Sequence, residues 1–212
     1  MINSVLLDRP LLFRLWHMFL GWGTVGLVYT LSGVLQGKGR VMEPSALDRM
    51  IAFSPHAVWL YMSFFIVVPL GYLLAPQDRV RWLSRSMRLT ALGAGMVYML
   101  WPTTLAYPVD QGSTLSSAML AFLTWVDSSQ NCLPSLHMAL MVLAVWGISA
   151  ARRTVRTALF VLWVAVIAWS ILQLRRHLFI DVLSGALLAV LAGWLVKMFE
   201  ESRKGVLKGD LQ

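Results

Sequence analysis

Six stretches of the chain are almost continuously apolar, and short polar or charged segments separate them. The stretches cover residues 15–36, 53–75, 89–107, 133–150, 155–173 and 178–196. Each is close to the ~20 residues that an α-helix needs to cross the hydrocarbon core of a bilayer. The pattern predicts an all-α polytopic membrane protein with six transmembrane helices, folded as a single domain over residues 1–212.

The composition agrees with this pattern. The chain is 58% hydrophobic and only 13% charged, with a mean hydropathy of +0.68, whereas soluble domains are about 25% charged. The first apolar stretch is long and no small-x-small cleavage site ends it, so we expect a membrane span rather than a cleaved signal peptide. Cys132 is the single cysteine, which excludes an intrachain disulfide and a zinc-thiolate cluster.

The distribution of basic residues predicts the orientation. If both termini are cytoplasmic, the inner side holds 13 of the 18 Lys and Arg residues and the outer side holds five, as the positive-inside rule requires. The inner residues are Arg9, Arg14, Arg79, Arg81, Arg85, Arg88, Arg152, Arg153, Arg156, Lys197, Arg203, Lys204 and Lys208.

The charges predict the partners of the protein, and the loops predict its location. A net charge of +8 in such a protein favours contact with anionic membrane lipids. We expect no nucleic acid partner, because the chain has no basic tail and no basic patch interleaved with aromatic residues. The loops are short and contain no Asn-x-Ser/Thr sequence, which favours a bacterial cytoplasmic (inner) membrane.

Two histidines and one aspartate stand where apolar stretches begin. His137 follows Pro134 and Ser135 at the start of the fourth stretch, and His177 and Asp181 stand at the start of the sixth. The predicted topology brings all three to the outer, periplasmic face. The four-residue spacing places His177 and Asp181 on one helical face. Ionisable residues at such positions are usually functional, so we predict that they form an active site.

The start of the fourth stretch has the features of a phosphate site. Pro134 suits the first position of a helix, which would leave the N–H groups of Ser135, Leu136 and His137 free. Free N–H groups at a helix N-terminus bind anions, and the Ser135 hydroxyl adds a donor. We therefore predict phosphate binding by Ser135 and Leu136, and protonation of a leaving oxygen by His137.

The start of the sixth stretch suits nucleophilic catalysis. A neutral His177 can attack phosphorus if a carboxylate holds its other ring nitrogen, and Asp181 is placed to do so. Arg175 and Arg176 lie on the outer side against the positive-inside pattern, and we predict that they bind phosphate. The alternative is that they extend to lipid headgroups.

Other interpretations of these residues remain open. The histidines could form a polar contact between helices, and two His with one Asp could bind a metal. We favour phosphoryl transfer without metal or cofactor, because the phosphate-binding features also need explaining. Asn131 either caps the fourth helix or contacts substrate. His17 and His56 show no partner in the sequence.

The connection over residues 108–132 carries Asp110 and Asp127 and no Lys or Arg. Its apolar middle, Leu115–Val126, predicts a short helix. This helix either lies in the membrane interface beside a lateral entrance for lipid or is a packed connecting helix.

Two segments resemble the signatures of the type 2 phosphatidic acid phosphatase superfamily. Asn131-Cys-Leu-Pro-Ser-Leu-His137 is similar to the second signature, usually Pro-Ser-Gly-His. His177-x-x-x-Asp181, with Ser170 upstream, is similar to the third, Ser-Arg-x5-His-x3-Asp. The Asn-Cys-Leu segment and Leu47-Asp-Arg…Phe53-Ser-Pro…Tyr61 look more like the branch that includes inositol phosphorylceramide synthases. The resemblance covers residues 47–195.

The resemblance implies a six-helix membrane fold and metal-independent phosphoryl transfer. It implies that His177 is the nucleophile, that Asp181 orients it, that His137 is the general acid and then the base, and that Ser135 binds phosphate. The first signature, Lys-x6-Arg-Pro, is absent, as it is in the synthase-like branch. Ile171 replaces the arginine of the third signature, and Arg175 and Arg176 are candidates to replace the missing cations.

Together these observations predict a phosphatase that acts on a lipid phosphate or pyrophosphate at the extracytoplasmic face. Candidate substrates are polyprenyl pyrophosphate, phosphatidic acid and phosphatidylglycerol phosphate. The alternative is a phosphotransferase that passes a phosphoryl group or phospho-headgroup to a lipid alcohol, because one phosphohistidine serves both reactions. A non-catalytic membrane protein is a more remote alternative.

Overall fold

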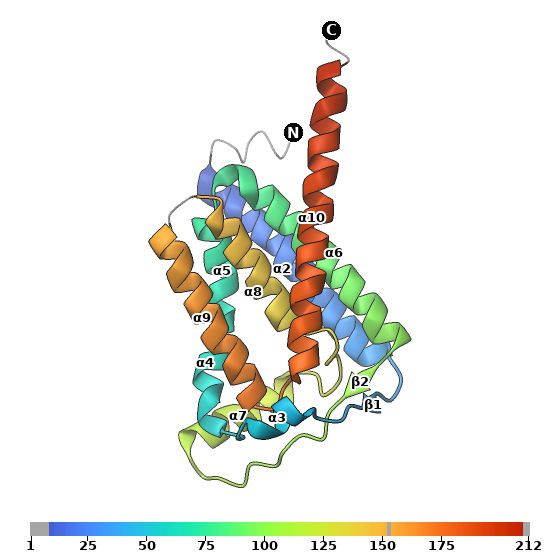
Figure 1. The fold of residues 1–212 in the computed structure, drawn as a ribbon, viewed down its shortest axis with the longest axis vertical. Helices are drawn as coiled ribbons and strands as arrows, with labels where there is room; N and C mark the ends of the chain where they lie inside the picture. Colours follow the sequence, from blue (N-terminus) through green and yellow to red (C-terminus); the bar gives the residue numbers. More distant parts are fainter. Residues whose placement is uncertain (1–8, 152–153, 210–212) are drawn as a thin grey trace.

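The structure of the protein is a computed structural model that describes residues 9–151 and 154–209, the last six as backbone only. Of the residues that predict the orientation, Arg152 and Arg153 therefore lie outside the described residues, as do the side chains of Lys204 and Lys208. The elements keep the labels of Figure 1.

The described part of the chain is a helical bundle with one two-residue strand pair. Its elements are α2 (Pro10–Leu35), β1 (Arg40–Val41), α3 (Ala46–Met50), η1 (Pro55–Ala57), α4 (Val58–Met62), α5 (Phe64–Leu74), α6 (Gln77–Leu100), β2 (Thr103–Thr104), α7 (Leu115–Val126), α8 (Leu136–Ser149), α9 (Thr154–Gln173) and α10 (Phe179–Gly209).

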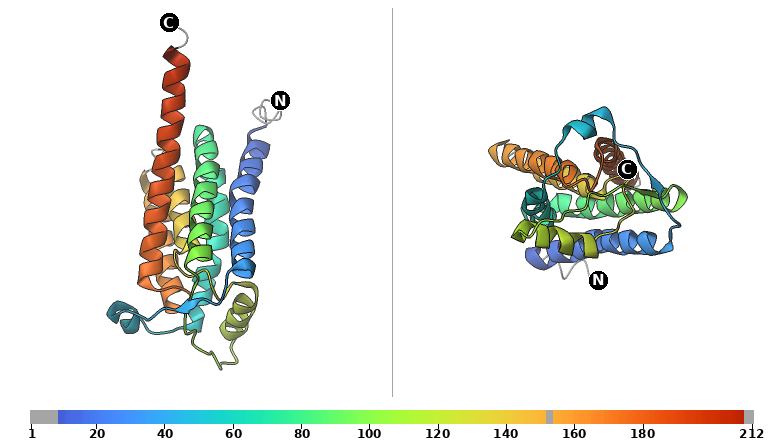
Figure 2. Two further views of the ribbon diagram at one scale, coloured as in Figure 1. Left: turned by 90° about the vertical axis from the view of Figure 1, so that its right-hand side faces the viewer. Right: turned by 90° about the horizontal axis from the view of Figure 1, so that it is seen from below.

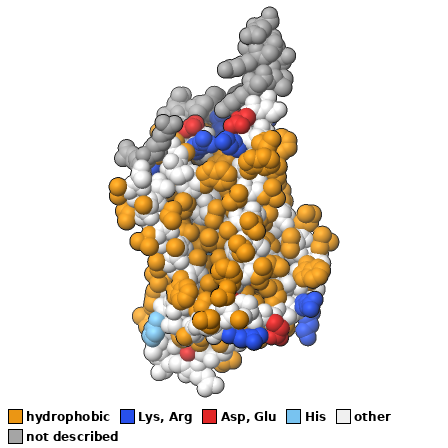
Figure 3. Space-filling model, in the orientation of Figure 1, with side chains coloured by type: hydrophobic (Ala, Val, Ile, Leu, Met, Phe, Trp, Pro, Cys, Tyr) orange, Lys and Arg blue, Asp and Glu red, His pale blue; other side chains and the backbone are white. Residues whose placement is uncertain are grey.

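The long helices run side by side along the length of the bundle (Figures 1 and 2). The start of α2 and the end of α10 lie at one end, and we call the opposite end, which carries α3, α7, β1 and β2, the loop end. Figure 2 shows α3 and α7 on opposite sides of the loop end. In Figure 3 hydrophobic side chains cover the middle of the face shown, with Lys and Arg toward its two ends.

Apolar helices account for most of the predicted spans. Four described segments are long and apolar enough to cross a membrane: Pro10–Leu35, Pro55–Leu74, Thr154–Gln173 and Phe179–Arg203. Leu136–Ser149 and Leu115–Val126 are shorter apolar helices. The helical fold and an integral membrane location are thus supported, while the number of spans and the side of the termini remain predictions.

The third predicted span differs most from the structure. Helix α6 begins at Gln77, not near residue 89, and ends at Leu100. The arginine-containing segment before residue 89 forms the first turns of α6. Asp78 lies in the first of these turns, at the end of a helix where a negative charge is stabilising. The helix ends early because Trp101 precedes Pro102, which disfavours helical geometry; Trp101 has φ −142° and ψ 66°.

The residues after α6 form part of the loop end instead of a helix. Strand β2 pairs in parallel with β1, with Arg40 opposite Thr103. The Arg40 N–H donates to the Pro102 carbonyl at 2.9 Å. This pair ties the chain leaving α2 to the chain leaving α6, an arrangement that the apolar pattern did not predict.

The predicted helix at Leu115–Val126 is confirmed with the same bounds. Its N-cap is Thr114, whose side chain accepts a hydrogen bond from the Ser117 N–H. Leu123 is buried, whereas Trp125 is 81% exposed, and α7 lies against η1 and α4. The helix therefore packs on the bundle with one face and leaves an aromatic edge outside. Whether that edge meets the membrane interface remains a prediction.

Candidate active site

His177 and Asp181 lie on either side of the start of α10. His177 precedes the helix, in the connection after α9, and Asp181 is in the first turn. The Asp181 Oδ2 accepts from the Leu178 N–H at 2.8 Å and lies 3.5 Å from His177 Nδ1. The predicted proximity is confirmed. It arises because Asp181 caps the helix start, not because both residues share a helical face.

His137 meets His177 across the bundle. The two ring nitrogens, His137 Nδ1 and His177 Nε2, are 3.4 Å apart, and the ring centroids are 5.6 Å apart. His137 comes from the first turn of α8, and His177 from the α9–α10 connection. The structure thus brings His137 to His177 and Asp181, which lie 40 or more residues further along the chain.

Contact between α8 and α10 sets this geometry. The Ser135 N–H donates to the Asp181 carbonyl at 2.9 Å. A Cβ at Gly185, one turn further along α10, would lie 2.2 Å from the Ser135 carbonyl oxygen. Only glycine allows so close an approach of the two backbones. The start of α8 is therefore fixed on the turn that carries Asp181.

Gly185→Ala is expected to separate α8 from α10 and to lower stability by about 1–3 kcal/mol, because the contact is with rigid backbone. Thermal unfolding in detergent measures the effect. Gly26→Ala on α2 is the matched control, since a Cβ there meets nothing within 4 Å. Equal unfolding temperatures for the two variants would contradict this interpretation of the contact.

The start of α8 differs from the prediction in detail. Helix α8 begins at Leu136, with Ser135 as its N-cap, so Pro134 lies outside the helix. The Ser135 side chain accepts from the Met138 N–H, its own N–H is bound to Asp181, and the residue is fully buried. The prediction of a free Ser135 N–H was therefore wrong. The N–H groups of Leu136 and His137 belong to the first turn, where a helix offers them no acceptor.

The two neighbouring arginines point to different places. The Arg175 guanidinium donates to the backbone carbonyls of Asp48 and Ile51, and Arg175 has a positive φ of 53°. Arg175 thus anchors the segment around α3, away from the histidines. Arg176 is 5% exposed and faces the site. Of the two arginines, the structure brings only Arg176 to the histidines.

Asp48 completes this anchor. Its carboxylate accepts from the Phe179 N–H at 2.7 Å and from Ser45, which links α3 to the first residue of α10. Burial opposes ionisation of Asp48. The hydrogen bonds from Ser45 and Phe179 and the charge of Arg175 outweigh burial and lower the pKa of this carboxyl. The segment around α3 therefore holds the connection that carries His177.

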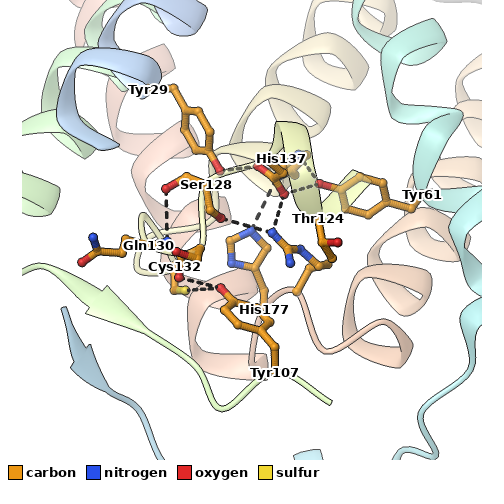
Figure 4. A network of polar contacts seen from close by, with 12 residues as sticks. Tyr29, Tyr61, Tyr107, Thr124, Ser128, Gln130, Cys132, His137 and His177 are labelled. Carbon is orange, nitrogen blue, oxygen red and sulfur yellow. Dashed lines mark hydrogen bonds and ion pairs between the residues drawn. The ribbon is translucent and has the colours of Figure 1, made fainter. Parts of the chain in front are cut away.

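Asp127, at the end of α7, is a site residue that the sequence did not identify. Its Oδ2 accepts from Arg176 Nη2 at 2.9 Å, and its Oδ1 accepts from the Tyr29 hydroxyl at 2.6 Å. The Tyr61 hydroxyl lies 3.3 Å from Oδ2. Figure 4 shows Tyr29 and Tyr61 reaching the site from two sides, with His137 and His177 nearby. No spacing rule connects Asp127 to Arg176, because they are 49 residues apart.

The Asp127–Arg176 pair is buried and ionised. Burial alone would raise the pKa of Asp127, but His137, Arg176 and the Tyr29 hydroxyl outweigh it, so this pKa lies below its usual range. Arg176 also donates to the Ser128 carbonyl at 3.1 Å, and its guanidinium lies 4.6 Å from the Tyr107 ring centroid. The buried Arg176 Nε has no hydrogen-bond partner and remains free to bind an anion.

Asn131 joins two segments of the chain through its side-chain amide. Its Oδ1 accepts from Gln36 Nε2 at 2.6 Å, and its Nδ2 donates to the Tyr29 carbonyl at 2.9 Å. The residue is 1% exposed. It does not cap α8, since Ser135 does, and its amide joins the loop before α8 to α2. The capping interpretation is therefore wrong, and contact of Asn131 with substrate stays a prediction.

The remaining histidines lie outside the site. His56 Nδ1 is 3.0 Å from the Ser116 hydroxyl, and His17 packs on Phe13 within α2. Ile171, at the position of the missing signature arginine, is fully buried. Among the residues that the structure describes, no group of three His, Cys, Asp or Glu side chains could hold a metal ion.

Two cavities flank the Asp127–Arg176 pair. The first, of about 200 Å³, touches His137 and Asp127 and is otherwise mainly apolar. It lies between α2, α4, α5, α7 and α8, and its apolar lining includes Trp22, Gly26, Phe65 and Val126. The second, of about 230 Å³, touches Arg176 and has more polar walls, including Tyr107, Asp110, Ser117 and Thr124.

These features define a class of protein: a helical membrane protein with a buried site of paired histidines, carboxylates and one arginine at the loop end. The model of the PAP2 superfamily matches residues 41–195, and the chain therefore belongs to this superfamily. Comparisons with curated proteins and with solved structures give no match. Membership supports a function of the phosphatase or phosphotransferase type. The synthase-like branch remains a prediction.

Proposed function

We propose that the protein is a metal-independent phosphatase that acts on a lipid phosphate or pyrophosphate through a phosphohistidine at His177. The proposal rests on one observation: His177 Nε2 lies 3.4 Å from His137 Nδ1, and Asp181 lies beside the other ring nitrogen of His177, Nδ1. This arrangement supports a nucleophile with a carboxylate behind it and a proton donor beside it, both within reach of one phosphate group.

The proposed reaction has two steps. His177 Nε2 forms a bond to phosphorus while the bond from phosphorus to the leaving oxygen breaks, and His137 Nδ1 gives that oxygen a proton. Water then bonds to phosphorus and gives a proton to His137 Nδ1, and the N–P bond breaks. Asp181 stabilises the charge that develops on His177. Arg176 binds the phosphoryl oxygens through its unpaired Nε–H edge.

The first cavity supports a lipid as the substrate. Its walls are mainly apolar, and it reaches His137 and Asp127 from between the helices. A lipid chain in this cavity would place its phosphate beside the histidines. Three further features of the proposal are the loop end as the extracytoplasmic end, six spans and a bacterial cytoplasmic membrane. The first rests on the bias of basic residues toward the other end, the second on the six apolar stretches, and the third on the short loops without an Asn-x-Ser/Thr sequence.

Phosphate release from a panel of lipids tests the function. Detergent-purified protein is incubated with polyprenyl pyrophosphate, phosphatidic acid or phosphatidylglycerol phosphate in the presence of EDTA. Release of inorganic phosphate that EDTA does not inhibit is the expected result. Release that depends on a divalent cation, or none from any lipid, would contradict the proposal.

Gly26→Leu tests the cavity as the chain site. Open space surrounds Gly26, so the new side chain narrows the cavity without disturbing the fold. We expect about tenfold lower kcat/KM for long-chain lipid phosphates and an unchanged value for a short-chain, water-soluble analogue. Gly23→Leu, on the same helix but outside the cavity lining, is the control. An equal loss for both chain lengths would place the chain elsewhere.

A phosphotransferase is the second candidate, and the second cavity favours it. This cavity reaches Arg176 from the side of Asp110 and Thr124, so it could hold a hydroxyl acceptor while the first holds the donor lipid. Incubation with a donor and a lipid alcohol separates the two functions. A transfer product without released phosphate would favour the transferase.

A further inference from the structure

The two site histidines each have a carboxylate nearby, but only His177 meets its carboxylate directly. His137 Nε2 lies 2.7 Å from the Tyr61 hydroxyl, and this hydroxyl lies 3.3 Å from Asp127 Oδ2. Tyr61 therefore stands between His137 and Asp127. Each ring nitrogen of His137 therefore has its own neighbour: Nε2 contacts Tyr61, and Nδ1 contacts His177.

The surrounding rings hold His137 in this orientation. Phe64 packs edge-on against it, with ring centroids 4.7 Å apart, and the Tyr61 ring is 5.0 Å away. Tyr61 is fully buried. A ring flip would need both aromatic side chains to move, so Nε2 stays toward Tyr61 and Nδ1 toward His177.

Asp127 is a fixed acceptor for the Tyr61 proton. Its carboxylate is ionised and held by Arg176 and Tyr29. A carboxylate accepts hydrogen bonds and a phenol has one hydrogen. When the Tyr61 hydroxyl donates to Asp127, its oxygen accepts from His137, and Nε2 must then carry a proton.

We infer that Asp127 and Tyr61 form a relay that keeps one proton on His137 Nε2 and leaves Nδ1 as the nitrogen that exchanges a proton with substrate. Tyr61 is thus a positioning residue. The catalytic part of this inference rests on the proposed function. The charged and titratable groups around His137 are Tyr61 from α4, Asp127 from α7, and Arg176 and His177 from the α9–α10 connection.

The relay explains how one histidine serves both steps. As an acid, His137 carries protons on both nitrogens and gives the one on Nδ1 to the leaving oxygen, which leaves a neutral ring with the proton on Nε2. The free Nδ1 then accepts a proton from water as water attacks phosphorus. With its single proton on Nδ1, facing His177, a neutral ring would be a poor acid at that nitrogen, and Nδ1 would be unable to accept the proton of the attacking water.

Leaving-group dependence tests the catalytic part. Tyr61→Phe keeps the ring and removes the hydroxyl. We expect about 10–100-fold slower release from an alkyl phosphate, whose leaving oxygen needs a proton, and little change with a nitrophenyl phosphate, whose leaving group departs as an anion. Tyr72→Phe is the matched control, because Tyr72 is also buried but contacts Met87 on α6. Equal losses with both substrates would mean that Tyr61 only packs, and would overturn the inference.

Nitrogen NMR of ¹⁵N-histidine-labelled protein tests the relay without any activity. The His137 signals are assigned from a His137→Gln sample. We expect the neutral His137 ring to carry its proton on Nε2 in the wild type and in Tyr72→Phe, and on Nδ1 in Tyr61→Phe. A wild-type proton on Nδ1 would overturn the relay. If the wild type shows the expected tautomer but no lipid releases phosphate, the relay stands and the proposed function fails.

Discussion

His177→Ala is expected to abolish phosphate release, with a loss of roughly 10⁴-fold or more, because the variant lacks the proposed nucleophile. His177 lies 5% exposed between His137 and Asp181, so the variant removes the nucleophile and leaves its neighbours in place. Phosphate release with labelled lipid measures the rate, and rapid quenching at alkaline pH should detect labelled phosphohistidine in the wild type but not in His177→Ala.

His56→Ala provides the matched control for this variant. His56 is exposed and contacts Ser116, so both activity and labelling should persist. A labelled protein in the His177→Ala sample would place the nucleophile at another residue. An inactive but labelled His56→Ala variant would show that the η1–α7 contact matters for the second step.

Arg176→Met is expected to have two large effects. It leaves the Asp127 carboxylate buried without its cation, which costs about 3–5 kcal/mol of stability. It also removes the proposed phosphate donor, which should slow turnover by about 10²–10³-fold. The pKa of Asp127 is lowered in the folded protein. Its stabilising contribution is therefore present above the ordinary carboxyl pKa and is lost as the pH falls through the lowered value.

A double variant separates these two effects. In Arg176→Met/Asp127→Asn neither partner is charged, so we expect stability close to that of the wild type, measured by thermal unfolding at pH 7. Its activity should stay well below that of Asp127→Asn alone if Arg176 binds the phosphoryl group. Equal activities of the double variant and Asp127→Asn would limit Arg176 to neutralising Asp127.

Arg175 and Arg176 are neighbours in the chain with the same pattern in the sequence, yet their side chains make different contacts. Arg175 and Arg176 both break the positive-inside pattern, and no signal in the sequence separates them. The positive φ of Arg175 turns its side chain toward the carbonyls of Asp48 and Ile51, whereas Arg176 turns inward to Asp127. Backbone conformation, which depends on packing around α3, made this distinction.

The sequence by itself determined the helical membrane fold, the helix at Leu115–Val126 and the proximity of His137, His177 and Asp181. It could do so because apolar length is a local property of the chain, and because the alternation of apolar helices brings the starts of the fourth and sixth stretches to the same end. Tertiary structure alone decided the contacts of Asp127 and Tyr61 with the site, the parallel β1–β2 pair and the packing of Ser135 on Gly185. These contacts join residues far apart in the chain, and the direction of each side chain depends on how the helices pack together, which no local pattern encodes.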